Sequence, residues 1–222
     1  MQATIVVNGL HIGDCLAKIE DFVTHDAYQA YDRDGVRAEP RPDVISSRQL
    51  TLMNSAMRAR SSRKAWKPFL DRPIEELVAV PCDVDLVDDL EERVQDALVR
   101  LRRMIELLCV PWITDMAATK MLFLKRPKLV AISDDYVRRR LAVDMAPGPD
   151  RAIEVEWRVR AIGLANLPAL KSLQAHAQML RDSTGEPVVL SKARILDILL
   201  WVEEALLPGR HRFWSGRYAL AR

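Results

Sequence analysis

The segment VPWITDMAATKMLFLKRPKLVAISDDYVRRR, residues 110–140, decides how this sequence is interpreted. It contains a Pro-Trp pair, an apolar stretch with one lysine, the basic run Lys-Arg-Pro-Lys, and two adjacent aspartates. Pro111 is expected to end the preceding helix, because proline lacks a backbone N–H and its ring clashes with the turn before it. Helices are predicted at residues 115–124 and 134–145. The segment therefore predicts a tight turn near residues 109–116 between two helices, followed by a loop and a third helix.

The regions on both sides of this segment also have helical patterns. Apolar residues recur at three- and four-residue steps over residues 86–108, whose first turns are acidic and later turns basic, as the helix dipole favours. Ser46 and Gln49 have the spacing of a capping box, which predicts a helix that begins within residues 45–59. Further helices are expected at 150–164, 168–182 and 191–206.

Two stretches near the N-terminus are predicted to be non-helical. Residues 32–42 are polar, with one glycine and two prolines, and are expected to form a loop. Residues 3–8 alternate weakly and favour a short strand. The sequence therefore predicts an all-α, multi-helix single domain over residues 1–206. Residues 207–222 are a basic, aromatic tail.

Composition excludes several classes of protein. The chain has 222 residues and a net charge of +2, so its overall charge favours no particular partner. Its three cysteines are far apart and are expected to be reduced core thiols, and the four histidines have no metal-ligand spacing. No apolar run reaches the roughly 18 residues of a membrane span, and no signal peptide is recognisable. We expect a cytoplasmic protein with no metal and no cofactor.

The central segment resembles a known superfamily. Residues 110–122, VPWITDMAATKML, look like a degenerate helix-hairpin-helix of the base-excision DNA glycosylases, with the hairpin at Val110, Pro111 and Ile113. This alignment places Met116 where bifunctional members have a Schiff-base lysine, and Asp134 at the position of the catalytic aspartate. The same stretch is similar to the signature of a bacterial protein family with no known activity. The resemblance covers about thirty residues and implies the glycosylase fold.

Three positions depart from the superfamily's pattern. Trp112 and Thr114 stand where the hairpin has glycines, which let backbone N–H groups approach a DNA phosphate. Met116 cannot act as a nucleophile. These departures leave two functions open. One is a glycosylase that acts on a flipped base; the other is a non-enzymatic member that binds DNA or a protein partner.

Asp134 and Lys120 are the candidate catalytic residues. The resemblance implies that Asp134 stabilises positive charge at the sugar or positions a water molecule. Asp134 also suits the N-cap of a helix that starts near Asp135, and this reading is favoured. Lys120 lies one turn beyond Met116, where partial burial would lower its pKa toward use as a nucleophile. The favoured alternative is a lysine that extends from the edge of the core to solvent.

Clustered basic residues suggest that the partner is double-stranded DNA. Lysine and arginine in clusters are typical of phosphate-binding surfaces, and an aromatic side chain among them can stack on a base. We expect two clusters to face a common groove, although solvated helix faces explain the pattern about equally well. The candidate DNA-binding residues are Lys125, Arg126, Lys128, Arg138, Arg139, Arg63, Lys64 and Trp66.

Overall fold

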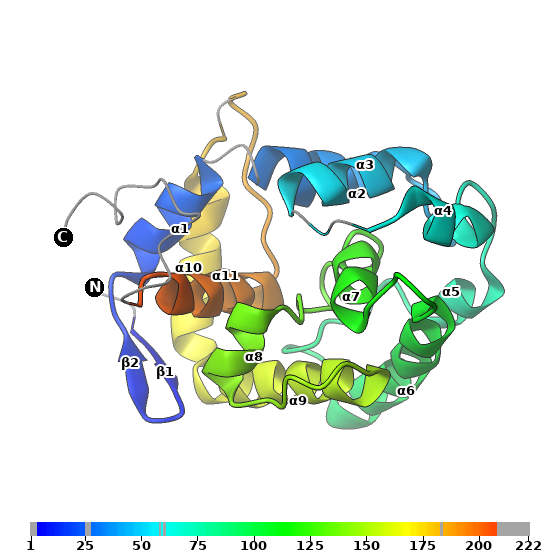
Figure 1. Cartoon of the computed structure of the whole chain (residues 1–222). Helices are drawn as coiled ribbons and strands as arrows, with labels where there is room; N and C mark the ends of the chain where they lie inside the picture. The colour runs from blue at the N-terminus through cyan, green and yellow to red at the C-terminus, as the bar shows by residue number, and fades with distance from the viewer. Residues whose placement is uncertain (1–3, 25–27, 58, 60, 183, 208–222) are drawn as a thin grey trace.

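A computed structural model describes residues 4–24, 28–57, 59, 61–182 and 184–207, and this part of the chain is mostly helical (Figure 1). Its one sheet is a hairpin of β1 (Ile5–Val7) and β2 (Leu10–Ile12), antiparallel with Ile5 opposite Ile12. The predicted all-α class is therefore confirmed. The basic tail lies outside the described residues from 208 onward.

Eleven α-helices and two short helical segments follow the hairpin in the described residues. They are α1 (Cys15–Val23), the π-helix η1 (Tyr28–Arg33), α2 (Asp34–Arg37), α3 (Ser47–Ala56), α4 (Arg63–Trp66), the 3-10 helix η2 (Lys67–Phe69), α5 (Glu75–Ala79), α6 (Glu91–Leu108), α7 (Asp115–Phe123), α8 (Asp135–Leu141), α9 (Pro149–Ala165), α10 (Leu167–Met179) and α11 (Lys192–Ala205).

Two predicted helices are shorter than expected because side chains and backbone cap them. Asp85 accepts hydrogen bonds from the backbone N–H groups of Val87 and Asp88, so residues 85–90 form turns and α6 begins only at Glu91. Ala142 adopts a left-handed backbone with φ of 56°, which ends α8 at Leu141. The predicted capping box of Ser46 and Gln49 is present at the start of α3.

The predicted loop at residues 32–42 is in part helical, and this expectation was wrong for a specific reason. Gly35 lies within α2 and is buried. A Cβ atom at this position would come within 2.9 Å of Leu124 Cδ2. The glycine therefore permits close packing of α2 against the end of α7, and it does not mark a turn.

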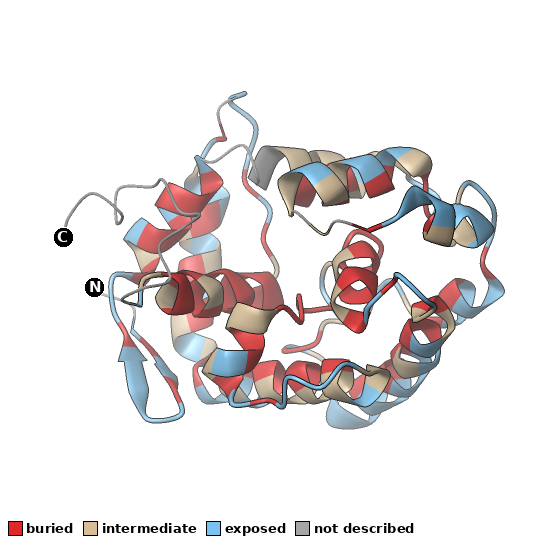
Figure 2. Cartoon of the chain, in the orientation of Figure 1, coloured by how far each residue is buried: buried red, intermediate tan, exposed pale blue. Residues whose placement is uncertain are grey.

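The hydrophobic core surrounds α11, which packs against α1, α8, α9 and α10. Buried residues from Ile5 to Val202 form one cluster. Figure 2 shows that α11 and α7 are buried on nearly all sides, whereas α3, α4 and α6 each expose one face. A helix that is buried all round must satisfy its polar side chains internally, and α11 carries several of them.

The cysteines depart from their expected positions. Cys15 is buried, but Cys82 is exposed and Cys109 is only partly buried. The prediction that all three are core thiols was therefore wrong. The described residues include no helix that is both long and apolar enough to cross a membrane.

Candidate functional site

The turn between α6 and α7 has the geometry of a type II β-turn. The backbone N–H of Ile113 donates to the carbonyl oxygen of Val110 at 2.9 Å, with Pro111 and Trp112 at the two central positions. Trp112 has φ of 78°, a conformation that favours glycine. Its side chain extends away from the core, and the residue is 82% exposed. The chain therefore keeps a glycine-like backbone at Trp112 despite the bulky side chain.

This turn presents polar backbone groups at the start of α7. Thr114 caps the helix by accepting a hydrogen bond from Ala117 N–H at 3.2 Å. Within the described part of the chain, the backbone N–H groups of Trp112 and Thr114 have no acceptor. Trp112 and Thr114 are both exposed residues at the start of α7, where the first N–H groups of a helix have no partner within the helix.

Asp134 lies at the N-cap of α8, as the favoured interpretation predicted. Its Oδ1 accepts hydrogen bonds from the backbone N–H groups of Tyr136 and Val137, both at 3.0 Å. Burial raises the pKa of this carboxyl, while the Lys120 ammonium and the two N–H groups oppose the shift. Asp134 lines neither of the two cavities described below.

Lys120 is half-buried and lies near Asp134. Its Nζ donates to the carbonyl oxygen of Met57 at 3.3 Å, just beyond the end of α3. The structure thus brings the two candidate catalytic residues within electrostatic reach of each other. Lys120 also has a clear structural role, because it satisfies a carbonyl group at a helix end.

Half of the predicted DNA-binding side chains are inside the protein. Trp66 has no exposed surface, Arg126 and Arg138 are each 1% exposed, and Lys125 is 8% exposed. Arg126 donates to four backbone carbonyl groups, those of Leu77, Val80, Lys125 and Pro42. These four side chains cannot contact DNA in this conformation, so the prediction was wrong for them. Their role is to satisfy and fill the core.

Arg138 and Lys125 also have internal partners. Arg138 forms a fully buried ion pair with Asp115 and donates to Ser133 Oγ at 2.8 Å. Lys125 donates to the carbonyl oxygen of Glu39 at 3.0 Å, and burial lowers the pKa of its ammonium to about 8. Sequence alone counted these charges as surface charges.

The other predicted DNA-binding residues are exposed but lie on separate elements. Arg63 and Lys64 are on α4, Arg139 is on α8, and Lys128 lies in the loop after α7. In Figure 1, α7 lies between α4 and α8. The expectation that the two clusters face a common groove stays a prediction.

A buried ionic group in the core was not predicted. Arg194 of α11 forms a bidentate ion pair with Asp32, at 2.6 and 2.8 Å, and a second ion pair with Asp197. The rings of Phe22, Tyr31 and Phe123 surround the guanidinium at 5.0–5.9 Å. The three-residue spacing of Arg194 and Asp197 beside the apolar run of α11 was the signal available in the sequence.

Asp197 is the member of this group with an unfilled hydrogen-bonding position. Its Oδ1 is buried and has no hydrogen-bond partner in the described structure. Burial raises the pKa of Asp197 to about 7; the Arg194 charge opposes this shift and the Asp134 charge adds to it. With Asp197 ionised, one buried arginine faces two carboxylates, which leaves a net negative charge in the core.

The Asp197→Asn substitution is expected to make stability less dependent on pH. A carboxyl whose folded pKa is raised stabilises the protein fully below its unfolded pKa near 3.8, and this contribution is lost as pH rises through about 7. The variant lacks this titration. Its free energy of unfolding at pH 8 should therefore be higher than that of the wild type by on the order of 1–2 kcal/mol. Urea unfolding at several pH values between 4 and 8 measures the difference. Asp150→Asn is the control, because Arg102 lowers the pKa of this exposed carboxyl, so its removal should not raise the free energy of unfolding at pH 8. Parallel pH profiles for Asp197→Asn and the wild type would contradict the prediction.

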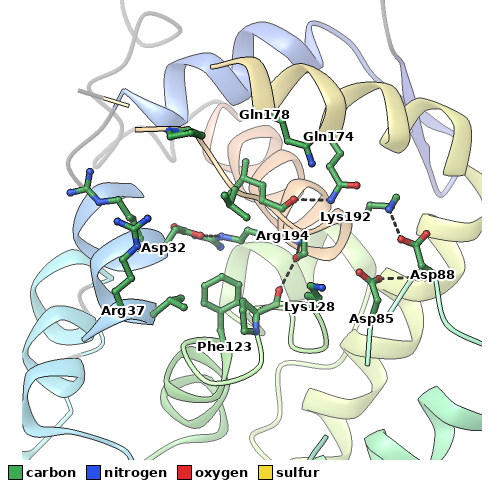
Figure 3. A pocket seen from close by; sticks show the side chains of 17 residues that line it. Asp32, Arg37, Asp85, Asp88, Phe123, Lys128, Gln174, Gln178, Lys192 and Arg194 are labelled. Atoms are coloured by element: carbon green, nitrogen blue, oxygen red, sulfur yellow. Dashed lines mark hydrogen bonds and ion pairs between the residues drawn. The ribbon is translucent and has the colours of Figure 1, made fainter. Parts of the chain in front are cut away.

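A cleft of about 580 Å³ opens beside this ionic group (Figure 3). Its walls come from α2, the turn at residues 85–88, the end of α7 with the following loop, α10 and the start of α11. A smaller cavity of about 310 Å³ lies beside the turn that contains Trp112. No group of three or more metal-ligating side chains occurs among the described residues.

Residues 16–204 match the model of a family of unknown function (DUF6308), and the chain belongs to that family. No curated protein and no solved structure matches the chain.

Proposed function

We propose that this member of the DUF6308 family binds double-stranded DNA through the turn between α6 and α7, without acting on a base. The observation that supports this most is the backbone at Trp112. Its φ of 78° is the conformation a glycine would favour in a helix-hairpin-helix. Trp112 therefore differs from the superfamily's glycine in its side chain, while its backbone conformation stays compatible with a phosphate contact.

The groups around this turn suit a phosphate and a base. The N–H groups of Trp112 and Thr114 lie at the start of α7, where the helix dipole favours negative charge. An exposed indole can stack on a base or enter a groove, a contact worth about 1–3 kcal/mol per base. The exposed side chains of Arg63, Lys64 and Arg139 remain available for separate phosphate contacts.

The enzymatic alternative has less support. Asp134 caps α8, has one oxygen engaged by two N–H groups, and lines neither the 580 Å³ nor the 310 Å³ cavity. A flipped base needs a pocket beside the reacting group. Met116 also cannot form a Schiff base. A non-enzymatic role requires none of these features, so we favour binding without catalysis.

Trp112→Gly is expected to separate folding from DNA binding. Glycine relieves the left-handed backbone, so the free energy of unfolding should rise by about 1 kcal/mol. Loss of the indole should weaken binding to a 20-base-pair duplex roughly 10-fold. Urea unfolding and fluorescence anisotropy at 50 and 200 mM salt measure the two effects, and wild-type affinity should fall steeply with salt.

Ala142→Gly is the matched control, because Ala142 also has a positive φ and is exposed. It should be stabilising without any change in DNA affinity. Wild-type protein that binds no duplex at 50 mM salt would refute the proposal, as would equal affinity of Trp112→Gly and the wild type. Base release from a damaged duplex that disappears in Asp134→Asn would refute its non-enzymatic part.

A further inference from the structure

The 580 Å³ cleft has no part in the proposed DNA contact, and its size is that of a small-molecule site. Figure 3 shows Arg194 and Phe123 in its interior, Gln174 and Gln178 on one wall, and Asp85 and Asp88 on another. Among the candidate DNA-binding residues, Lys128 alone lines it. The chemistry of a ligand can therefore be inferred from the charges in this cleft.

The cleft is already formed by ion pairs that fix one of its walls. Arg33 contacts Asp182 and Thr184, and Arg37 forms an ion pair with Glu186. These contacts hold the segment that follows α10 against α2. The same segment supplies Pro187, Val189 and Leu190 to the cleft, where they give an apolar surface. A ligand would not have to order this wall on binding.

Most charged groups in the cleft already have partners. Arg194 pairs with Asp32 and Asp197, and Lys192 pairs with Asp88. Arg33 and Arg37 pair with the segment that follows α10. In the described structure, Lys128 is the one cation lining the cleft whose side chain has no ion pair or hydrogen bond. Lys128 is therefore the charge that a ligand can neutralise.

Asp85 lines the same cleft, on the backbone segment beside Lys128. The carbonyl oxygen of Lys128 accepts a hydrogen bond from Leu86 N–H at 3.0 Å, which fixes the two segments side by side. Asp85 uses Oδ1 to accept from Val87 and Asp88, while its Oδ2 accepts no hydrogen bond in the described structure. The wall thus offers one cation and one carboxylate oxygen.

We propose that this cleft binds a small organic anion that carries a hydroxyl or amino group beside its negative group. The negative group pairs with the Lys128 ammonium, and the hydroxyl or amino group donates to Asp85 Oδ2. The rest of the ligand lies against the apolar wall of Pro187 and Leu190. A neutral or cationic ligand would leave Lys128 without a counter-charge.

The test is a titration of the full chain with three probes: glycerol 3-phosphate, malate and a nucleoside monophosphate. Inorganic phosphate and glycerol serve as the two half-ligands. Backbone amide shifts in NMR spectra report both affinity and location. At least one probe should bind, with shifts at Asp85, Lys128 and Leu190, and more tightly than either half-ligand. Lys128→Gln should weaken it roughly 10-fold or more, and Lys128→Arg should restore most of the affinity.

Lys64→Gln is the matched control, because Lys64 is an exposed lysine on α4, outside the cleft lining. The Lys64→Gln variant should bind the probes with wild-type affinity. The Trp112→Gly variant should also do so, because the turn that contains Trp112 is a separate site. Failure of all three probes to bind would overturn the proposal. Shifts confined to other surfaces, equal effects of Lys128→Gln and Lys64→Gln, or binding of inorganic phosphate as tight as that of the organic probes would also overturn it.

Discussion

Replacing Arg126 with methionine is expected to lower the free energy of unfolding by about 4 kcal/mol. Arg126 is buried and donates to four backbone carbonyl groups, two of which, Val80 and Leu77, belong to the segment around α5. Removing the guanidinium takes the donor from the Val80 carbonyl and leaves the Leu77 carbonyl with only the backbone N–H of Val80. A carbonyl left unsatisfied where water cannot reach it costs roughly 1–3 kcal/mol. That loss is a large fraction of the 5–15 kcal/mol typical of a folded domain.

Lys128→Met is the matched control for this substitution, because it removes a cation two residues away that is exposed and unpaired. Its effect on stability should be about 0.5 kcal/mol or less. Urea unfolding measures both variants, with the slope of the transition compared to detect a change in the unfolded state. A loss below about 1 kcal/mol for Arg126→Met would show that the buried guanidinium is not required by the core.

The Arg194→Met variant is expected to lose about 3–5 kcal/mol of stability at pH 8 and much less at pH 4.5. The substitution leaves Asp32 and Asp197 buried without a cation, which is the costly way to break a buried ion pair. Burial already raises the pKa of both carboxyls in the folded protein. Loss of Arg194 raises them further. The stability that depends on their protonation is present at low pH and is lost as pH rises through the folded pKa values.

Arg158→Met is the control for Arg194→Met. Arg158 forms an ion pair with Glu154 on the exposed face of α9, at 2.8 Å, and a pair of this kind contributes about 0–1 kcal/mol. Its small effect should vary little with pH, because neither partner is buried. Urea unfolding of both variants at pH 4.5 and 8 gives the comparison. An equal loss for Arg194→Met at the two pH values would contradict the role assigned to the buried carboxylates.

Local pattern in the sequence determined the main helices and some of their ends. The three- and four-residue apolar steps identified α6, α9 and α11, because one face of each must meet a core. Ser46 and Asp134 were read correctly as caps, since a cap depends only on the backbone N–H groups two and three residues later. Pro111 likewise placed the turn before α7. These features depend on neighbours along the chain.

The environment of each basic residue was decided by the tertiary structure. Arg126 and Lys128 are two positions apart in one basic run, yet one is buried among carbonyl groups and the other is exposed in a cleft. Trp66 follows two exposed basic residues and is nevertheless in the core. No local pattern separates these cases, because the groups that cover or satisfy each side chain come from distant segments.

The cleft beside Arg194 depends on the same long-range packing. The Asp32 that pairs with Arg194 lies 162 residues away in the chain, and Lys192 pairs with Asp88 across 104 residues. A charged residue is normally expected at the surface. That expectation fails when a distant segment supplies a buried partner of opposite charge. Here the sequence by itself determined most of the long helices and two of their caps. Only the tertiary structure decided which charges are paired inside the core and which cleft-lining cation, Lys128, has no partner in the described structure, because pairing is a property of the packed chain.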